Sequence, residues 1–238
     1  MKEAGPKPVA LVTGSRTGLG RAIAEWLVAQ SYRVFGASRQ PIEAPIPGAY
    51  THHLVDVTDE QALTKLIRTI AKEAGRLDVL INNAGTASMN HFLLTSGETL
   101  DRLLATNVKS TFVASREAAK IMRRRTFGRI VNLSTVAVPL ALEGEAAYVA
   151  SKSAVEALTR VLAKELAPLG ITCNALGPTP IKTDLLRGVP DEALDQILAR
   201  CAISRYGEMR DVLNVIDFFL RPESDYITGQ VLYLGGMS

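Results

Sequence analysis

The chain has 238 residues, of which 47% are hydrophobic and 21% are charged, and its formal net charge is +3. These values are ordinary for a soluble globular protein, and the charge is too small to indicate a nucleic-acid partner. The length suits one large α/β domain with a substantial core.

No apolar run reaches the roughly 20 residues that a membrane span needs, and residues 1–8 lack the apolar segment of a signal peptide. Cys173 and Cys201 have no metal-like spacing, which predicts free thiols in a reducing compartment. His52, His53 and His91 form no ligand pattern, so we expect no metal site. The sequence therefore predicts a cytoplasmic protein that does not associate with membranes.

Short apolar runs bounded by turn residues predict strands, and apolar residues at three- and four-residue spacing between them predict helices. Thr58 and Ser96 are expected helix caps. The predicted helices span residues 23–30, 58–74, 96–125 in one or two segments, 146–166 and 211–220. The predicted strands span residues 8–12, 33–37, 50–55, 77–81, 129–134, 171–176 and 231–234.

Three connections are expected to be irregular. Pro41, Pro45 and Pro47 exclude a regular helix from residues 40–49. The segment 136–144 is predicted to be a loop. Residues 177–207 contain several prolines and a short amphipathic helix, which is typical of a mobile lid.

A glycine-rich turn follows the first predicted strand and opens the first predicted helix. It reads Thr-Gly-Ser-Arg-Thr-Gly-Leu-Gly and places Gly14, Gly18 and Gly20 where the backbone turns tightly. Peptide N–H groups and the positive end of a helix can bind a pyrophosphate there. Glycine spacing alone is weak evidence, but its place between strand and helix favours a dinucleotide site. The alternating strands and helices predict a doubly wound, seven-stranded parallel sheet of the Rossmann type. Its helices cover both faces in one domain, residues 1–238.

Tyr148 and Lys152 lie four residues apart at the start of a predicted helix, so they share one face. A phenol is a poor acid or base at neutral pH unless a nearby positive charge favours the phenolate. Lys152 can supply that charge. Taken alone, such a pair is more often ordinary packing on a helix surface.

Four motifs occur in register with the predicted elements: the glycine turn, Asn82-Asn83-Ala84-Gly85 after the fourth strand, Asn107, and the Tyr148–Lys152 pair. Their order resembles that of the short-chain dehydrogenase/reductase family over residues 8–236. Within that family the chain is most similar to the 3-oxoacyl-acyl-carrier-protein reductase type.

The resemblance implies a catalytic set. Tyr148 would protonate a substrate carbonyl while hydride arrives from nicotinamide, and Lys152 would bind the nicotinamide ribose and lower the pKa of Tyr148. Asn107 would hold a water that replenishes the proton through Lys152, although it could simply stabilise a helix break. The family serine thirteen residues before the tyrosine is Thr135 here. Its hydroxyl can serve the same purpose, and the neighbouring Ser134 is expected to face the opposite side of the strand.

The cofactor implied is NADP, with NADPH preferred over NADH. No carboxylate ends the second strand, where Ser38-Arg39 stands instead, so Arg39 and Arg16 could clamp a 2′-phosphate. The alternative is a pair of solvated loop arginines. The cofactor-binding residues implied are Gly14, Arg16, Gly18, Leu19, Gly20, Ser38, Arg39, Asp56, Val57, Asn83, Ala84, Gly85, Tyr148, Lys152, Pro178 and Thr183.

The chain departs from the family pattern at three places. Thr179 follows Pro178 where a glycine is usual, Val138 replaces a small residue, and the helix between the second and third strands is missing. An apolar substrate pocket could be lined by Met89, Val138, Leu140, Leu142, Leu185 and Leu186, although such residues more often pack loops.

The leading hypothesis is an NADPH-dependent carbonyl reductase acting on a 3-oxoacyl thioester or similar ketone. The alternatives are an NAD(P)-dependent alcohol or cis-diol dehydrogenase and a nucleotide-binding relative without turnover. Arg123–Arg125 could meet an acidic acyl carrier protein, although cations there also complement the helix dipole. The resemblance implies a homodimer or homotetramer formed through the long helices.

Overall fold

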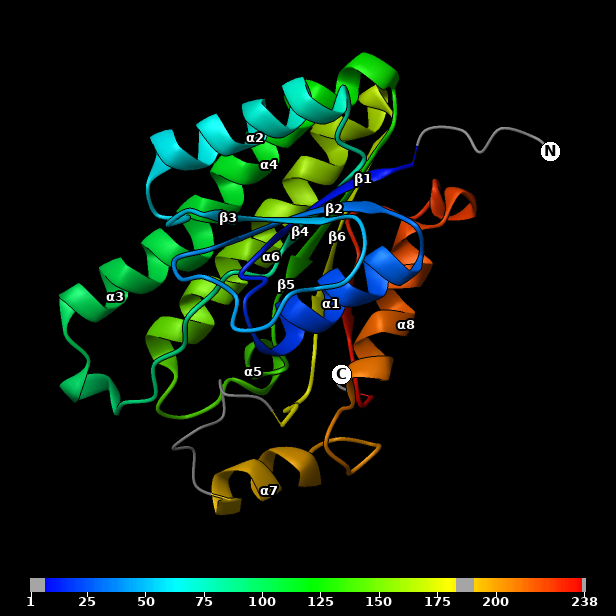
Figure 1. Cartoon of the computed structure of the whole chain (residues 1–238). Coiled ribbons are helices and arrows are strands. Elements are labelled where there is room, and N and C mark those ends of the chain that lie inside the picture. Colours follow the sequence, from blue (N-terminus) through cyan, green and yellow to red (C-terminus); the bar gives the residue numbers. More distant parts are fainter. Residues whose placement is uncertain (1–6, 183–190, 237–238) are drawn as a thin grey trace.

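The computed structural model describes residues 7–182 and 191–236, which form one α/β domain around a parallel sheet (Figure 1). The strands lie in the order β3-β2-β1-β4-β5-β6-β7, and every neighbouring pair is parallel. The chain reverses its winding between β1 and β4, the place where doubly wound sheets bind ligands at the carboxyl ends of their strands. The strands are β1 (Val9–Thr13), β2 (Arg33–Ser38), β3 (Tyr50–Leu54), β4 (Val79–Asn82), β5 (Gly128–Leu133), β6 (Ile171–Gly177) and β7 (Val231–Tyr233).

Helices cover both faces of the sheet. Figure 1 shows α2, α4 and α6 on one face and α1 and α8 on the other, and each layer buries its own apolar cluster against the strands. The helices are α1 (Gly18–Ala29), α2 (Glu60–Ala74), α3 (Gly97–Leu103), α4 (Ser110–Met122), α5 (Ala137–Leu140), α6 (Ala146–Leu166), α7 (Asp191–Ala199) and α8 (Met209–Leu220). Short 3-10 turns span Phe92–Leu94, Arg123–Arg125, Ala167–Leu169 and Pro222–Ser224.

The predicted doubly wound, seven-stranded parallel sheet is confirmed. Residues 40–49 contain no helix, as the prolines predict. Two local predictions were wrong. The cap of α2 is Asp59, whose carboxylate accepts hydrogen bonds from two amides of the first turn, whereas Thr58 donates to Asp56. The predicted loop 136–144 contains the one-turn helix α5, because Val136 and Leu140 pack into a small apolar cluster.

The long helical stretch after Ser96 is not a single α-helix. Ser96 caps α3 as predicted, and a π-helical segment, Leu104–Lys109, then joins α3 to α4. Three apolar residues of this stretch, Leu100, Leu104 and Phe112, are exposed rather than buried. Their helical spacing therefore does not describe a single core-facing stripe.

The expected lid at 177–207 is described only in part, because residues 183–190 lie outside the described residues. None of the helices in the described part has the length and apolarity to cross a membrane. Residues 7–182 and 191–236 hold no group of three or more His, Cys, Asp or Glu side chains placed to bind a metal. Cys173 and Cys201 are buried free thiols.

Candidate active site

A cavity of about 470 Å³ opens at the carboxyl ends of the central strands. The glycine turn, the loop after β4, the end of β5, the start of α6 and the segment after β6 all contribute to its wall. Eleven predicted site residues line it together: Gly14, Gly18, Leu19, Gly20, Asn83, Ala84, Gly85, Thr135, Tyr148, Lys152 and Pro178. The fold therefore brings the predicted nucleotide-binding and catalytic motifs to one place.

The glycine turn closes tightly because its glycines allow it. Gly14 has φ of 68°, and a Cβ at Gly20 would lie 2.2 Å from the carbonyl oxygen of Gly14. Helix α1 begins at Gly18, and the side chain of its N-cap, Thr17, makes no capping hydrogen bond. The first amides of α1 thus have no side-chain acceptor, and the residues that carry them line the cavity. Such free N–H groups at a helix N-terminus suit a pyrophosphate anion.

The loop after β4 is tied directly to the glycine turn. The Asn83 side-chain amide donates to the carbonyl oxygens of Thr13 at 3.0 Å and Gly14 at 3.1 Å. The Thr13 hydroxyl in return accepts from the backbone N–H groups of Asn83 and Ala84. These bonds hold the two predicted cofactor motifs in fixed register across β1 and β4.

Tyr148 lies in the first turn of α6 and is buried. Burial, with a smaller contribution from the charge of Glu145, raises the pKa of its phenol to about 12, while a hydrogen bond with the Thr135 hydroxyl acts in the opposite direction. The Thr135 hydroxyl also accepts from the backbone N–H of Ala137 at 3.2 Å. Tyr148 is therefore a protonated acid at neutral pH in this structure.

Lys152 lies one turn further along α6, and its Nζ stands 6.0 Å from the centroid of the Tyr148 ring. It donates a 2.7 Å hydrogen bond to the carbonyl oxygen of Leu133, and burial lowers its pKa to about 8. The expected lowering of the Tyr148 pKa by Lys152 is not seen in this structure, where burial of the phenol raises this pKa and the Thr135 hydrogen bond is the effect that lowers it.

Asn107 lies in the π-helical segment and is buried behind the cavity. Its Oδ1 accepts from the Thr86 N–H at 2.9 Å, and its Nδ2 donates to the Thr86 carbonyl and the Ser151 hydroxyl, both at 2.9 Å. A Cβ on Gly85 would lie 3.3 Å from Asn107 Oδ1 and 3.4 Å from Lys152 Nζ. Gly85 therefore stands between Asn107 and Lys152 and leaves space that a side chain would fill.

The expectation that Ser134 and Thr135 face opposite sides is wrong, because both follow the end of β5, line the same cavity and hydrogen-bond side chains of α6. The Ser134 hydroxyl donates a 2.6 Å hydrogen bond to Glu156, which also accepts from the Tyr233 hydroxyl at 2.7 Å. Thr179, the residue in place of the family glycine, is 5% exposed. Its side chain occupies the space left by Gly207 and Gly235, where a Cβ would approach it to 2.7 Å.

The predicted adenosine end lies outside the wall of this cavity. Arg16 donates to the Pro41 carbonyl at 3.1 Å and forms a 2.6 Å ion pair with Glu43. Asp56 is exposed, and its pKa is lowered first by hydrogen bonding from Thr58 and also by the charge of Arg39. The Ser38 hydroxyl donates to the Gln40 carbonyl at 2.6 Å. Val57, which follows Asp56, is buried. Thr183 lies outside the described residues.

Of the predicted substrate wall, only Leu142 lines the cavity among the described residues. Val138, Leu140 and Met89 do not line it, and of these Leu140 packs into the core and Met89 is exposed. Leu185 and Leu186 lie outside the described residues. The sequence did not single out Glu145, which lines the cavity three residues before Tyr148. The same helical spacing that connects Tyr148 with Lys152 would have found it.

Comparison with known proteins agrees with this geometry. A family model described as enoyl-(acyl carrier protein) reductase matches residues 14–238. The 3-oxoacyl-[acyl-carrier-protein] reductase FabG of Staphylococcus aureus is 34% identical over 236 residues, covering 95% of this chain and 96% of that protein. Aldohexose dehydrogenase of Thermoplasma acidophilum superimposes with a TM-score of 0.88 at 32% identity, over 97% of this chain and 94% of that one.

A further similar structure is ElxO with NADP bound, with a TM-score of 0.87, 31% identity, and coverage of 96% of this chain and 97% of that one. The motifs, the cavity they line and these full-length matches agree with one another. This chain belongs to the short-chain dehydrogenase/reductase family and is an NAD(P)-dependent oxidoreductase acting on CH–OH groups.

Proposed function

We propose that the protein is an NADPH-dependent carbonyl reductase. The observation that carries this proposal is the convergence of a protonated Tyr148, the Thr135 hydroxyl and Lys152 in one cavity with the glycine turn. A ketone oxygen within hydrogen-bond reach of the phenol would receive its proton as hydride adds to the carbonyl carbon. When bound, the reduced nicotinamide supplies that hydride.

Each residue has a separate task in this reaction. Thr135 orients the ketone oxygen and shares its hydrogen bond with Tyr148. Lys152 holds the nicotinamide ribose. Asn107 fixes the loop at Thr86 by hydrogen bonds. A water held beside Asn107 would pass a proton from solvent through Lys152 to Tyr148 after each turnover. The product alcohol then carries the hydride on carbon and the former phenol proton on oxygen.

The substrate we favour is a 3-oxoacyl thioester. The Staphylococcus aureus relative bears the name of a 3-oxoacyl-[acyl-carrier-protein] reductase and matches nearly the whole chain. Apolar side chains from α7, Leu194 and Ile197, line the far wall of the cavity and suit an acyl chain. We propose that the segment 177–207, to which α7 belongs, serves as the lid over this chain.

The second candidate is an alcohol or cis-diol dehydrogenase. It is supported by the similarity to an aldohexose dehydrogenase. Reduction is favoured because the Staphylococcus aureus relative bears the name of a reductase and matches nearly the whole chain. A nucleotide-binding relative without turnover is less well supported, because Tyr148 and Lys152 are both in place.

NADPH is the favoured cofactor because Arg16 and Arg39 flank the end of β2, where no carboxylate ends the strand. A guanidinium pair can bind the 2′-phosphate of NADPH through charged hydrogen bonds, whereas NADH carries no phosphate at this position for the pair to bind. ElxO, a similar structure, has NADP bound.

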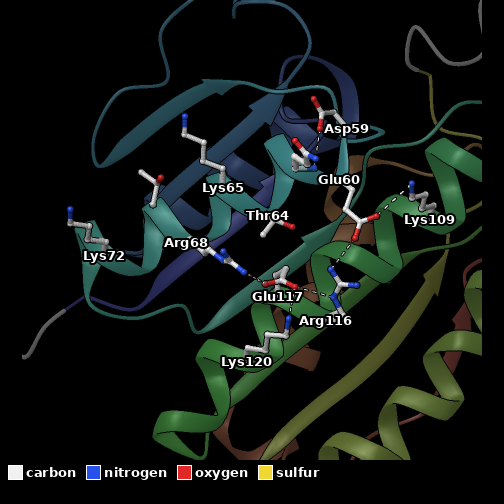
Figure 2. A pocket seen from close by; sticks show the side chains of 12 residues that line it. Asp59, Glu60, Thr64, Lys65, Arg68, Lys72, Lys109, Arg116, Glu117 and Lys120 are labelled. Atoms are coloured by element: carbon white, nitrogen blue, oxygen red, sulfur yellow. Dashed lines mark hydrogen bonds and ion pairs between the residues drawn. The ribbon is translucent and has the colours of Figure 1, made fainter.

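An acyl carrier protein is a candidate partner. Figure 2 shows an open groove between α2 and α4 in which basic side chains, among them Lys65, Lys72 and Lys120, outnumber the acids. The exposed Arg123–Arg125 turn continues this surface, since Arg123 and Arg124 line an adjoining hollow with Lys120. An acidic carrier would complement this charge.

We also propose a homodimer or homotetramer. Phe112 on α4 is 45% exposed and Val161 on α6 is 51% exposed, and a second copy could cover them. A monomer at micromolar concentration in light scattering would refute this proposal.

The direct test follows the absorbance of NADPH with 3-oxoacyl thioesters, simple ketones and diols. We expect oxidation of NADPH by a 3-oxoacyl thioester, and a tighter dissociation constant for NADPH than for NADH. Turnover of diols with NAD and not of ketones with NADPH would favour the dehydrogenase. A protein that binds NADPH without any turnover would support the non-catalytic reading.

A further inference from the structure

Glu145 is a carboxylic acid in the cavity wall, close to the reacting group. Among the described residues that line the cavity it is the sole acid, and Lys152 is the sole cation. Lys152 donates its hydrogen bond to Leu133 rather than to Glu145. The two charges in the cavity therefore do not neutralise each other through a described contact.

Helix capping does not explain Glu145. It occupies the N-cap position of α6, yet its side chain makes no capping hydrogen bond. Within residues 7–182 and 191–236, no side chain forms an ion pair or hydrogen bond with its carboxyl group. Burial alone raises its pKa to about 7. The carboxyl group therefore faces the cavity without a hydrogen-bond partner from the described part of the chain, and a bound ligand can supply one.

The position of Glu145 is fixed relative to the reacting group. It precedes Tyr148 by three residues in the first turn of α6, so both side chains lie on one face of the helix. The negative charge of Glu145 contributes to the raised pKa of the Tyr148 phenol. The cavity residues contributed by α5 and α7 are the apolar Ala137, Leu194 and Ile197. A substrate whose carbonyl meets Tyr148 would thus place its neighbouring atoms between the Glu145 carboxyl group and these apolar side chains.

We propose that Glu145 is a specificity-determining residue that accepts a hydrogen bond from an O–H or N–H group of the substrate beside the reacting carbonyl. This inference rests on the proposed ketone reduction and adds the class of substrate. Ketones without a donor would leave the Glu145 carboxyl group without a hydrogen-bond partner in the substrate, which costs binding free energy. Substrates with a donor avoid this cost and bind more tightly.

Two sources of the donor share this chemistry. One is the amide N–H of the cysteamine arm of an acyl thioester, and the other is a hydroxyl group on a carbon next to the ketone. Three probes separate them: ethyl 3-oxobutanoate without a donor, the N-acetylcysteamine thioester of 3-oxobutanoate with an amide donor, and 1-hydroxy-2-butanone with a hydroxyl donor.

The experiment compares kcat and KM with NADPH for the three probes in wild type, Glu145→Ala and Glu145→Leu. We expect kcat/KM for one donor-bearing probe to fall at least tenfold, chiefly through KM, while the donor-free ester changes less than twofold. The probe that loses most identifies the donor. Equal losses for all three probes, or no loss for any, would overturn the proposal.

Glu143→Ala is the matched control, since Glu143 is an exposed acid two residues away that does not line the cavity. It removes the same charge and should leave all three specificities unchanged. The dissociation constant for NADPH should also be unchanged in Glu145→Ala, which separates substrate recognition from cofactor binding.

Failure of the proposed function is distinguishable from failure of this inference. If no probe is reduced, the carbonyl reductase proposal fails for these ketones. The inference is then tested through binding, by the shift in melting temperature of the NADP-saturated protein with 1,2-butanediol and with 2-butanol. A larger shift with the diol that disappears in Glu145→Ala supports it, and identical shifts in wild type and variant overturn it.

Discussion

The Nζ atom of Lys152 donates a 2.7 Å hydrogen bond to the carbonyl oxygen of Leu133, the last residue of β5. This bond fixes an α6 side chain to the end of the central sheet at the level of Thr135 and Tyr148. The ammonium is held there at an energetic cost, because burial lowers its pKa to about 8 from an ordinary 10.5.

Lys152→Met should therefore stabilise the protein in a pH-dependent way. Below about pH 8 both folded and unfolded wild type carry the proton, and the burial cost is fully present. Between about 8 and 10.5 the folded protein loses its proton first, so the wild type gains stability as the pH rises. The advantage of Lys152→Met in unfolding free energy should be about 3 kcal/mol at pH 7, less the lost hydrogen bond, and should shrink toward pH 10.

Chemical denaturation at pH 7, 8.5 and 10 measures this effect. Lys164→Met is the control, because Lys164 is an exposed lysine on the same helix. A difference between wild type and Lys152→Met that does not vary with pH would contradict the prediction.

Tyr148→Phe should abolish reduction of ketones, with kcat lower by about 10³-fold or more, because the ring then has no proton to donate. NADPH binding should remain within about twofold.

Thr135→Ser should preserve or raise kcat, since it keeps the hydroxyl and removes the methyl group. Thr135→Ala should lower kcat roughly tenfold, and an unaffected rate would remove Thr135 from the catalytic set.

Glu43→Gln should tighten NADPH binding. In the structure Glu43 forms an ion pair with Arg16, so a 2′-phosphate must compete with its carboxylate. Exposed ion pairs contribute about 0.2–1 kcal/mol, which corresponds to about 1.5- to 5-fold in the dissociation constant. NADH binding should not change. Fluorescence titration measures both constants, and Glu25→Gln, which releases Arg21 instead, is the control. Equal effects on NADPH and NADH would show that Arg16 does not bind the 2′-phosphate.

Gly20→Ala should destabilise the glycine turn although alanine favours helices. A Cβ there would stand 2.2 Å from the Gly14 carbonyl oxygen and 2.3 Å from the Asn83 amide. The steric cost should exceed the helix-propensity gain of about 0.5–1 kcal/mol, so the melting temperature and NADPH affinity should both fall. Gly97→Ala is the control, since an added Cβ on Gly97 meets nothing within 4 Å. A more stable Gly20→Ala protein would contradict this packing argument.

Glu145→Gln should stabilise the protein above neutral pH. The Glu145 pKa is raised to about 7, so the folded state retains a proton that the unfolded state loses above about pH 4.5. Wild-type stability therefore falls between pH 4.5 and 7, and the variant escapes this loss. Because the carboxyl group is partly exposed, we expect only about 1 kcal/mol at pH 8 and little difference at pH 4. Thermal melts at both pH values check this, and a larger gain at pH 4 would contradict it.

The sheet could be predicted from the sequence because the strands of a parallel sheet are buried on both faces and are therefore apolar runs. The sequence also predicted which motifs meet, because the carboxyl ends of β1, β4 and β5 share one edge. Local competition between polar groups was harder to foresee. Thr58 and Asp59 are both good caps, and only the fold shows that Asp56 engages Thr58.

The electrostatics of the site could not be predicted from spacing. A Tyr–Lys pair at four-residue spacing indicates proximity, but burial and the Leu133 carbonyl determine where the ammonium points and how strongly each group holds its proton. The sequence also does not show that Glu145 lines the cavity, because a carboxylate at a helix N-terminus is equally typical of an exposed side chain that complements the helix dipole.

The π-helical segment Leu104–Lys109 sets the rotational phase between α3 and α4. It accommodates one residue more than an α-helix of the same rise, and each residue turns an α-helix by about 100°. Deleting one residue here would let a continuous α-helix form and would turn Asn107 away from Thr86 and Ser151, or else turn the buried face of α4 away from the sheet. The extra residue thus lets one helical stretch keep Asn107 on Thr86 and Ser151 while it also keeps the buried face of α4 against the sheet.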